Sequence, residues 1–157
     1  MELEEAKNLL AALYRNGVEY VLIGSMGMAA QGLVRATRDM DFFVSSRRDN
    51  IEKLKSALKS VFGNDENIDL ITHDDLAGDY PAIEYVPPHG RYHVDILTRL
   101  GENYRYEDIE WEEMEMDGIR CRIATPSMLY RMKLNSLRPR DQADAAWLNE
   151  RFKIEVE

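Results

Sequence analysis

Two aspartates, Asp39 and Asp41, are separated by a single hydrophobic residue at the start of an apolar stretch. Residues 41–45 are predicted to form a β-strand, in which successive side chains alternate between the two faces. Both carboxylates are therefore expected to project to one side, while Met40 points to the other. Two ionised carboxylates about 4 Å apart repel by roughly 4 kcal/mol at an effective dielectric constant near 20. A divalent cation between them would remove this cost, and carboxylate oxygens suit Mg²⁺ or Mn²⁺.

A third acid, Asp95, stands between Val94 and Ile96 in a second apolar stretch that is predicted to form a strand over residues 92–97. A carboxylate in such a setting needs a hydrogen-bonding partner or a metal ion. If this strand lies beside the strand of Asp41, the three acids Asp39, Asp41 and Asp95 meet at one point. Three carboxylates can support a two-metal centre, which aligns an attacking oxygen and clamps a phosphate.

Gly24 and Ser25 follow a predicted strand, residues 20–23, and precede a short predicted helix, residues 25–31. A glycine at such a turn lets the backbone approach a phosphate closely, and the start of a helix offers free N–H groups. A structural turn is the alternative interpretation of Gly-Ser, and a solvated turn is the alternative for Asp-x-Asp. The order of these features along the chain favours a phosphate and metal site.

The remaining patterns predict an α/β (α+β) fold, in which a mixed central sheet is flanked by helices. Asp117-Gly118 is a strong signal for a β-hairpin turn. Pro139 is expected to prevent the helix before it from continuing, and Asp141 is expected to cap the last helix. Helices are predicted at residues 2–16, 49–61, 125–137 and 141–152, and the remaining strands at 82–86, 113–116 and 119–123. Residues 63–80 are predicted to be a loop with a short helix near Thr72.

The chain has 157 residues, enough for one domain over 1–157 with a sizeable core. Its single cysteine excludes an internal disulfide, and no apolar run is long enough to span a membrane, so a cytoplasmic location is expected. The net charge of −9 opposes broad binding to a nucleic-acid backbone. A local basic segment, residues 131–140, nevertheless keeps contact with phosphates open.

These motifs resemble those of the nucleotidyltransferase superfamily with the polymerase-beta-like fold. The similarity rests on Gly24-Ser25, on Asp39-Met40-Asp41 and on Asp95, and it covers about residues 18–100. Thirteen residues separate Ser25 from Asp39, which is at the long end of the expected spacing. The resemblance implies that an NMP is transferred from an NTP to a hydroxyl acceptor with release of pyrophosphate. It also implies that Asp39, Asp41 and Asp95 bind Mg²⁺ or Mn²⁺.

The C-terminal part, about residues 125–153, resembles the AbiEii-like toxin and minimal nucleotidyltransferase branch. It is predicted to form C-terminal helices, with Lys133 on a helix before the stretch Arg140–Asp144. The resemblance implies that Lys133, with Gly24 and Ser25, contacts the NTP. It also implies a toxin–antitoxin enzyme with an antitoxin or toxin partner, acting on tRNA or on a protein. A small-molecule acceptor uses the same chemistry. The alternative for Lys133 is that its stem covers apolar surface while its ammonium reaches water.

Two further hypotheses stay open at this stage. One is a non-catalytic binding or antitoxin module that uses the same scaffold. The other is an unrelated α/β domain whose aspartates cap loops. The most useful observation is whether the carboxyl groups of Asp39, Asp41 and Asp95 converge, with the Gly24-Ser25 turn facing them.

Overall fold

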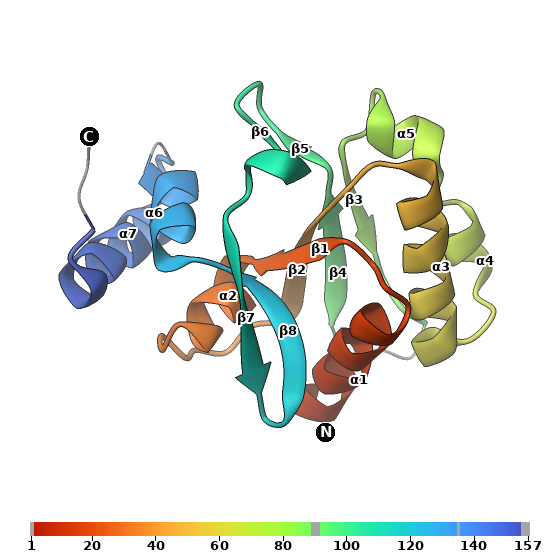
Figure 1. Cartoon of the computed structure of the whole chain (residues 1–157), viewed down its shortest axis with the longest axis horizontal. Helices are drawn as coiled ribbons and strands as arrows, with labels where there is room; N and C mark the ends of the chain where they lie inside the picture. Colours follow the sequence, from red (N-terminus) through yellow and green to blue (C-terminus); the bar gives the residue numbers. More distant parts are fainter. Residues whose placement is uncertain (1, 89–91, 135, 155–157) are drawn as a thin grey trace.

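The computed structural model describes residues 2–88, 92–134 and 136–154. The sequence also predicts a turn at Pro87-Pro88-His89-Gly90, between the strands at 82–86 and 92–97, and His89 and Gly90 lie outside the described residues. Helices and strands alternate over residues 2–44, and groups of consecutive helices and consecutive strands follow (Figure 1). The helices are α1 (Glu2–Arg15), α2 (Gly24–Ala30), α3 (Arg48–Phe62), α4 (Glu66–Asp69), α5 (His73–Ala77), η1 (Tyr106–Asp108), α6 (Pro126–Leu134) and α7 (Pro139–Phe152). The strands are β1 (Tyr20–Ile23), β2 (Asp39–Val44), β3 (Ala82–Tyr85), β4 (His93–Leu97), β5 (Arg99–Leu100), β6 (Tyr104–Arg105), β7 (Trp111–Met116) and β8 (Ile119–Ala124).

Six strands form one mixed sheet in the order β3-β4-β2-β1-β8-β7. The pairs β2–β4 and β1–β8 are parallel, and the other three pairs are antiparallel. This arrangement confirms the predicted mixed sheet with flanking helices. Strands β5 and β6 form a separate two-stranded hairpin beyond the end of β4.

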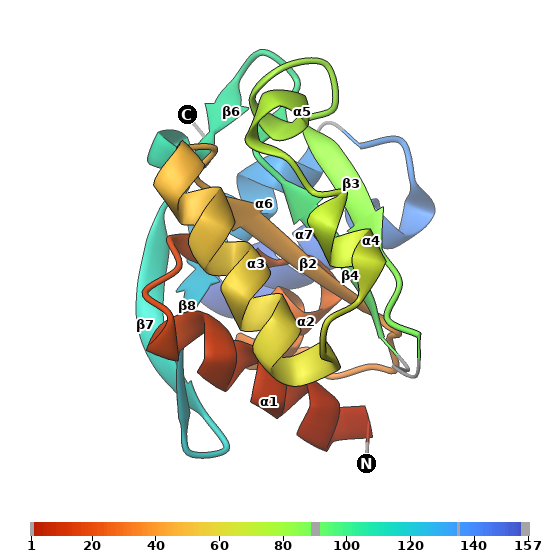
Figure 2. The same cartoon turned by 90° about the vertical axis from the view of Figure 1, so that its right-hand side faces the viewer.

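Helices cover both faces of the sheet. Helices α1, α3, α4 and α5 pack on one face, and Figure 2 shows them in front of the strands with α6 and α7 behind. Helix α2 contributes Met28, and α6 and α7 contribute Leu129 and Leu148, to a second buried cluster with Phe43 of β2. The sheet therefore separates two hydrophobic cores, and each core orders one face of β2.

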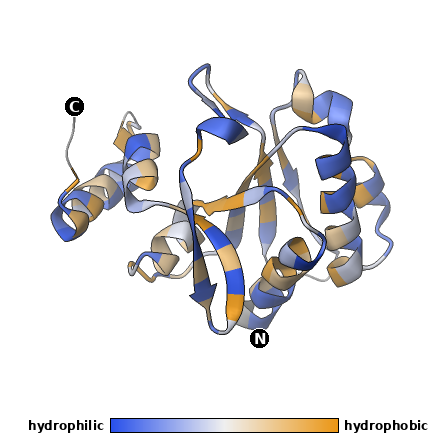
Figure 3. Ribbon diagram, viewed as in Figure 1, coloured by the Kyte–Doolittle hydropathy of each residue, from blue (hydrophilic) through white to orange (hydrophobic). Residues whose placement is uncertain are grey.

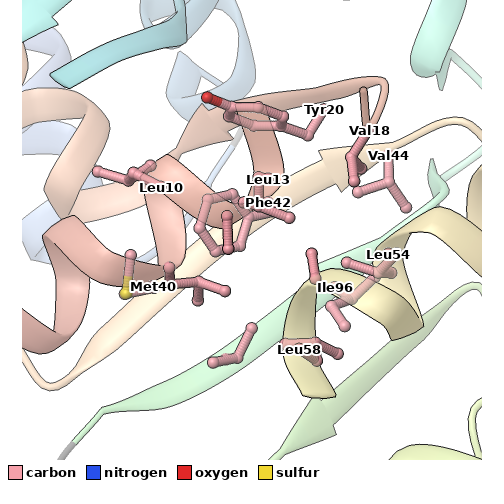
Figure 4. Close-up of a cluster of buried hydrophobic side chains, with 14 of the residues drawn as sticks. Leu10, Leu13, Val18, Tyr20, Met40, Phe42, Val44, Leu54, Leu58 and Ile96 are labelled. Carbon is pink, nitrogen blue, oxygen red and sulfur yellow. The ribbon is translucent and has the colours of Figure 1, made fainter. Parts of the chain in front are cut away.

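The larger core contains Met40, Phe42 and Val44, the alternate residues of β2 that point away from Asp39 and Asp41. Figure 4 shows these side chains among residues from α1 and α3, such as Leu10 and Leu58. The alternation predicted for this strand is thus confirmed. Burial of the hydrophobic set fixes the register of β2, because a shift by one residue would turn both aspartates into the core.

The edges of the sheet are more polar than its centre. Figure 3 shows β7 and the β5–β6 hairpin in mostly hydrophilic colours, while β1 is hydrophobic. The predicted turn between β7 and β8 is present, with Asp117 and Gly118 at φ 54° and 84°. Positive φ at both positions is the signature of the tight hairpin turn that Asp-Gly favours.

The structure corrects several predicted boundaries. Strand β2 begins at Asp39 rather than at residue 41, and α6 ends at Leu134 rather than at residue 137. Helix α7 begins at Pro139 with Arg138 as its N-cap, so the prediction that Asp141 caps the helix is wrong. Proline suits the first helical turn because its missing N–H would have no partner there. The loop predicted at 63–80 contains α4 as well as the predicted helix, which is capped by Thr72.

Candidate active site

The site is built around the point where β1 ends and α2 begins. Ile23, the last residue of β1, pairs with Asp41 of β2, and Gly24 follows with a positive φ of 66°. A Cβ atom added at Gly24 would lie 2.0 Å from Oδ2 of Asp41. The Asp41 carboxylate therefore rests against the backbone of the Gly24-Ser25 turn, in space that a larger residue would fill.

Asp95 lies directly beside Asp41. Strands β2 and β4 run parallel, and the register pairs Asp41 with Asp95 and Asp39 with His93. The two side chains lie close enough for Asp95 to raise the pKa of the Asp41 carboxyl through a shared proton and through its charge. The two strands are therefore neighbours, which is the condition under which the sequence predicts that the acids meet. Two of the three carboxyl groups, those of Asp41 and Asp95, lie side by side on the face of the sheet opposite the larger core.

The environment of Asp41 opposes its negative charge. Burial, the hydrogen bond to Asp95 and the charges of Asp95 and Asp39 raise the pKa of the Asp41 carboxyl to about 7, while Lys133 acts in the opposite direction. A carboxyl group whose pKa is raised close to neutral pH by burial and by nearby negative charges is a recognised mark of a functional site. A divalent cation bound here would favour the ionised form.

Asp39 stands at the exposed start of β2, and its side chain is 55% exposed. His93 lies beside it, with Nδ1 3.9 Å from Oδ1 of Asp39 and 3.6 Å from Oε2 of Glu84. His93 thus borders the carboxylates. Asp39 contributes negative charge to the group but is turned further toward solvent than Asp41.

Lys133 reaches the same region from α6. Its ammonium lies 3.1 Å from Oδ1 of Asp141 and 3.0 Å from Oδ2 of Asp144, and its side chain is only 12% exposed. The ammonium is therefore held by two carboxylates of α7 and does not simply extend into water. Because Lys133 also acts on the pKa of Asp41, the C-terminal helices contribute a positive charge to the site.

Arg35 and Asp144 are residues whose place here the sequence did not reveal. The Asp144 side chain is 1% exposed and accepts hydrogen bonds from Arg35 and Lys133. Burial raises the pKa of Asp144, but the bonds and charges of these two cations outweigh it and keep the pKa below its usual value. Asp141 and Asp144 are three residues apart on a helix, which places them on one face. That spacing was a usable signal, whereas nothing in the sequence links Arg35 to α7.

The donor set fits a cation that is also bound by its substrate. Within residues 2–88, 92–134 and 136–154, no three His, Cys, Asp or Glu side chains converge tightly enough to hold a metal ion by themselves. Mg²⁺ is commonly held by one or two carboxylates together with substrate phosphates, and the Asp41–Asp95 pair supplies such ligands. Their oxygens also match the hard-ligand preference of Mn²⁺.

Comparison of the sequence with family models and with curated proteins gave no match. Comparison of the fold found several solved structures. One is a protein from Thermotoga maritima that is named as an inferred nucleotidyltransferase. Its TM-score is 0.58 and its sequence identity is 17%, and the match covers 94% of this chain and 92% of the other. Another is an antigenic nucleotidyltransferase-like protein from Paracoccidioides brasiliensis, with a TM-score of 0.58 and 13% identity over 94% and 76%.

A third similar structure comes from Helicobacter pylori and is also assigned to the nucleotidyltransferases by inference. It has a TM-score of 0.52 and 17% identity over 97% of this chain and 68% of the other. These matches show that the chain has the same mixed α/β fold as solved structures that are named as nucleotidyltransferases.

Within the described residues, no helix is long and apolar enough to cross a membrane.

Proposed function

We propose that the protein is a metal-dependent nucleotidyltransferase, which transfers an NMP from an NTP to a hydroxyl acceptor and releases pyrophosphate. The observation that carries this proposal is the pairing of Asp41 with Asp95 against the Gly24 turn. Like-charged carboxyl groups at adjacent positions of two strands destabilise a fold unless a cation lies between them or one of them is protonated. The nucleotidyltransferase names of proteins with the same fold support the same reaction class.

Each residue has a distinct part in this scheme. Asp39 and Asp41 would hold Mg²⁺ or Mn²⁺, and Asp95 would share a second ion and favour loss of the acceptor hydroxyl proton. The bound ions supply charge neutralisation at the triphosphate and lower the pKa of the attacking hydroxyl. Gly24 and Ser25 would bind the β- and γ-phosphates through backbone N–H groups and the Ser25 hydroxyl.

Lys133 would neutralise charge on the triphosphate. Asp141 and Asp144 fix the position of its ammonium, and Arg35 donates a hydrogen bond to the same Asp144 oxygen, Oδ2, that Lys133 contacts. The loop between α2 and β2, which carries Arg35, is thereby tied to α7. This ionic cluster fixes the position of the Lys133 ammonium of α6 relative to the carboxylates of the sheet.

Calorimetric titration with Mg²⁺ and ATP tests the nucleotide site directly. The wild type should bind metal–nucleotide, and the Asp39→Asn, Asp41→Asn double variant should not. Incubation with each labelled NTP, Mg²⁺ and either total RNA or cell lysate then identifies the base and the acceptor. Label in tRNA or in one protein would support a toxin–antitoxin role with a partner protein, whereas label in a small molecule would not. Binding of nucleotide without transfer in any of these mixtures would favour the non-catalytic binding module.

A further inference from the structure

Two arginines, Arg99 and Arg105, lie directly opposite each other in the β5–β6 hairpin. Residues opposite each other in an antiparallel pair project from the same face, with Cβ atoms about 5 Å apart. Like charges at such positions destabilise the pair. Within the described parts of the chain, neither guanidinium group has a carboxylate within 4 Å, although many other basic side chains do. The carboxylate of Asp108 accepts a hydrogen bond from the backbone N–H of Arg105, not from its guanidinium.

Both arginines line a cavity of about 140 Å³ at the end of the main sheet. This is several times the roughly 30 Å³ that one water molecule occupies, which is enough for a tetrahedral oxyanion. The cavity also contacts Ser46, which follows β2, and Thr98, which joins β4 to β5. It therefore lies beyond the ends of the two strands that carry the candidate carboxylates.

The walls of the cavity are held by hydrogen bonds. The Thr98 hydroxyl donates to the backbone carbonyl of Leu76 in α5, and the Thr98 N–H donates to the carbonyl of Pro81 at 2.8 Å. The Ser46 carbonyl contacts Nδ1 of His73 at 2.6 Å. The two arginines thus face a preformed wall, which reduces the ordering that a ligand would require.

We propose that Arg99 and Arg105 form a phosphate-binding site, separate from the metal and triphosphate site and independent of it. Guanidinium groups bind phosphate oxygens through paired N–H donors, and two of them on one face can contact one phosphate from both sides. The ligand is a phosphate monoester or phosphate end group, on either a small molecule or an RNA. The chain has a net charge of −9, so most of its surface repels phosphate. A pair of adjacent arginines whose guanidinium groups have no carboxylate partner among the described residues is therefore unusual in this molecule and supports a specific anion site.

Among the residues that the structure describes, Glu107 is the one acid that lines the cavity. Its carboxylate opposes a bound anion, so it sets the affinity of the site against the two arginines. Substitutions in the same cavity should therefore change the affinity for phosphate in opposite directions. Removing the arginine charges should weaken phosphate binding, and removing the Glu107 charge should strengthen it.

The test is a titration of ¹⁵N-labelled full-length protein with inorganic phosphate, followed by amide NMR shifts at fixed pH and low salt. It is run with EDTA in the Asp39→Asn, Asp41→Asn background, so failure of the proposed enzymatic site cannot affect it. Saturable shifts are expected at residues 46, 98, 99 and 105–107. The Arg99→Gln, Arg105→Gln double variant should bind at least about tenfold more weakly, and Glu107→Gln severalfold more tightly.

The matched control is the Arg15→Gln, Arg120→Gln double variant, which removes the same charge from residues that do not line the cavity. Its affinity should equal that of the parent. Should the arginine pair prove necessary for folding, the single Arg105→Gln variant, at an exposed position, replaces the double variant. Shifts absent from the cavity, or equal affinities in the cavity and control variants, would overturn the proposal.

Competition with AMP, and with one RNA carrying either a 5′-phosphate or a 5′-hydroxyl, distinguishes the two sources of phosphate. Displacement only by the phosphorylated RNA identifies a nucleic-acid end. Displacement by AMP, with no difference between the two RNAs, identifies a small phosphate ester. Failure of every phosphate-bearing competitor to displace inorganic phosphate contradicts the assignment to a phosphate ester.

Discussion

At the scale of single residues, the site depends on how closely Gly24 approaches Asp41. The absence of a side chain at Gly24 leaves room for the Asp41 carboxylate, and its positive φ turns the backbone from β1 into α2. Asp41 in turn pairs with Asp95. One glycine therefore fixes both the path of the chain and the place of a carboxylate.

The Gly24→Ala variant should lose binding of Mg²⁺–ATP, because the new Cβ would displace the Asp41 carboxylate. Its free energy of unfolding should also fall by about 1–3 kcal/mol from backbone strain and the clash. Gly17→Ala is the matched control, since Gly17 has nearly the same φ of 67° but nothing within 4 Å of an added Cβ. Calorimetry and thermal melting of both variants measure the two effects. Equal nucleotide affinities in the two variants would contradict the role given to this contact.

The raised pKa of Asp41 predicts a pH-dependent stability in the absence of metal. The unfolded chain ionises Asp41 near its usual pKa of 3.8, but the folded protein retains the proton up to about pH 7. Stability contributed by this group is therefore lost as the pH rises from about 4 to about 7, on the order of 4 kcal/mol in total. The Asp41→Asn variant removes that loss.

In EDTA, Asp41→Asn should be more stable than the wild type at pH 8 and the difference should shrink toward pH 4. Denaturant unfolding at several pH values gives the difference directly. Asp49→Asn serves as a control, because Asp49 lies on exposed helix surface and, among the described residues, forms only long ion pairs with Arg47 and Lys53. A constant difference between the Asp41 variant and the wild type across this range would show that the charge of Asp41 does not oppose folding.

At the scale of elements, α7 acts as a support for α6. Asp141 and Asp144 face Lys133 from adjacent turns, and Asp144 also binds Arg35 of the loop before β2. Two atoms of this cluster, Nε of Arg35 and Oδ1 of Asp144, are buried without a hydrogen-bond partner among the described residues. The cluster therefore has little tolerance for removal of another partner.

The Asp144→Ala variant should lose about 2–4 kcal/mol of stability, because it leaves the partly buried cations of Arg35 and Lys133 without their shared carboxylate. It should also weaken binding of Mg²⁺–ATP, since Lys133 would no longer be positioned. Asp141→Ala should have a smaller effect on stability, because the Asp141 side chain is more exposed and Asp144 still holds Lys133. Chemical denaturation and calorimetry at a temperature where both variants are folded separate the two effects. Equal stability of the two variants would contradict the central place of Asp144.

The elements that the sequence predicted well are those defined by local pattern. Alternation placed Asp39 and Asp41 on one face of β2, and Asp117-Gly118 marked the hairpin turn. The β5–β6 hairpin was not predicted, because two-residue strands have no periodicity to detect. The contact between Arg35 and Asp144 joins residues 109 positions apart, and no local pattern encodes such a distance. Register between β2 and β4 likewise followed only from the folded sheet.

At the scale of the whole molecule, the sheet separates the candidate chemistry from the larger core. Leu58 of α3 is fully buried against the face of β2 and β4 that lies opposite Asp41 and Asp95 (Figure 4). The Leu58→Ala variant should therefore lose about 2–5 kcal/mol of stability. Its affinity for Mg²⁺–ATP, measured by calorimetry well below its melting temperature, should stay within about twofold of the wild type. A large loss of affinity would show that the two faces are coupled.

The central strand β1 has β2 on one side and β8 on the other, and β8 belongs to residues 119–124. During synthesis on the ribosome, β1 therefore keeps an open edge until residues 119–124 have left the exit tunnel. Lys133 and Asp144 emerge later still. A nascent chain would consequently expose a hydrophobic strand edge while residues 24–118 are being made, and it would gain the charged groups of α6 and α7 only after β8 has emerged.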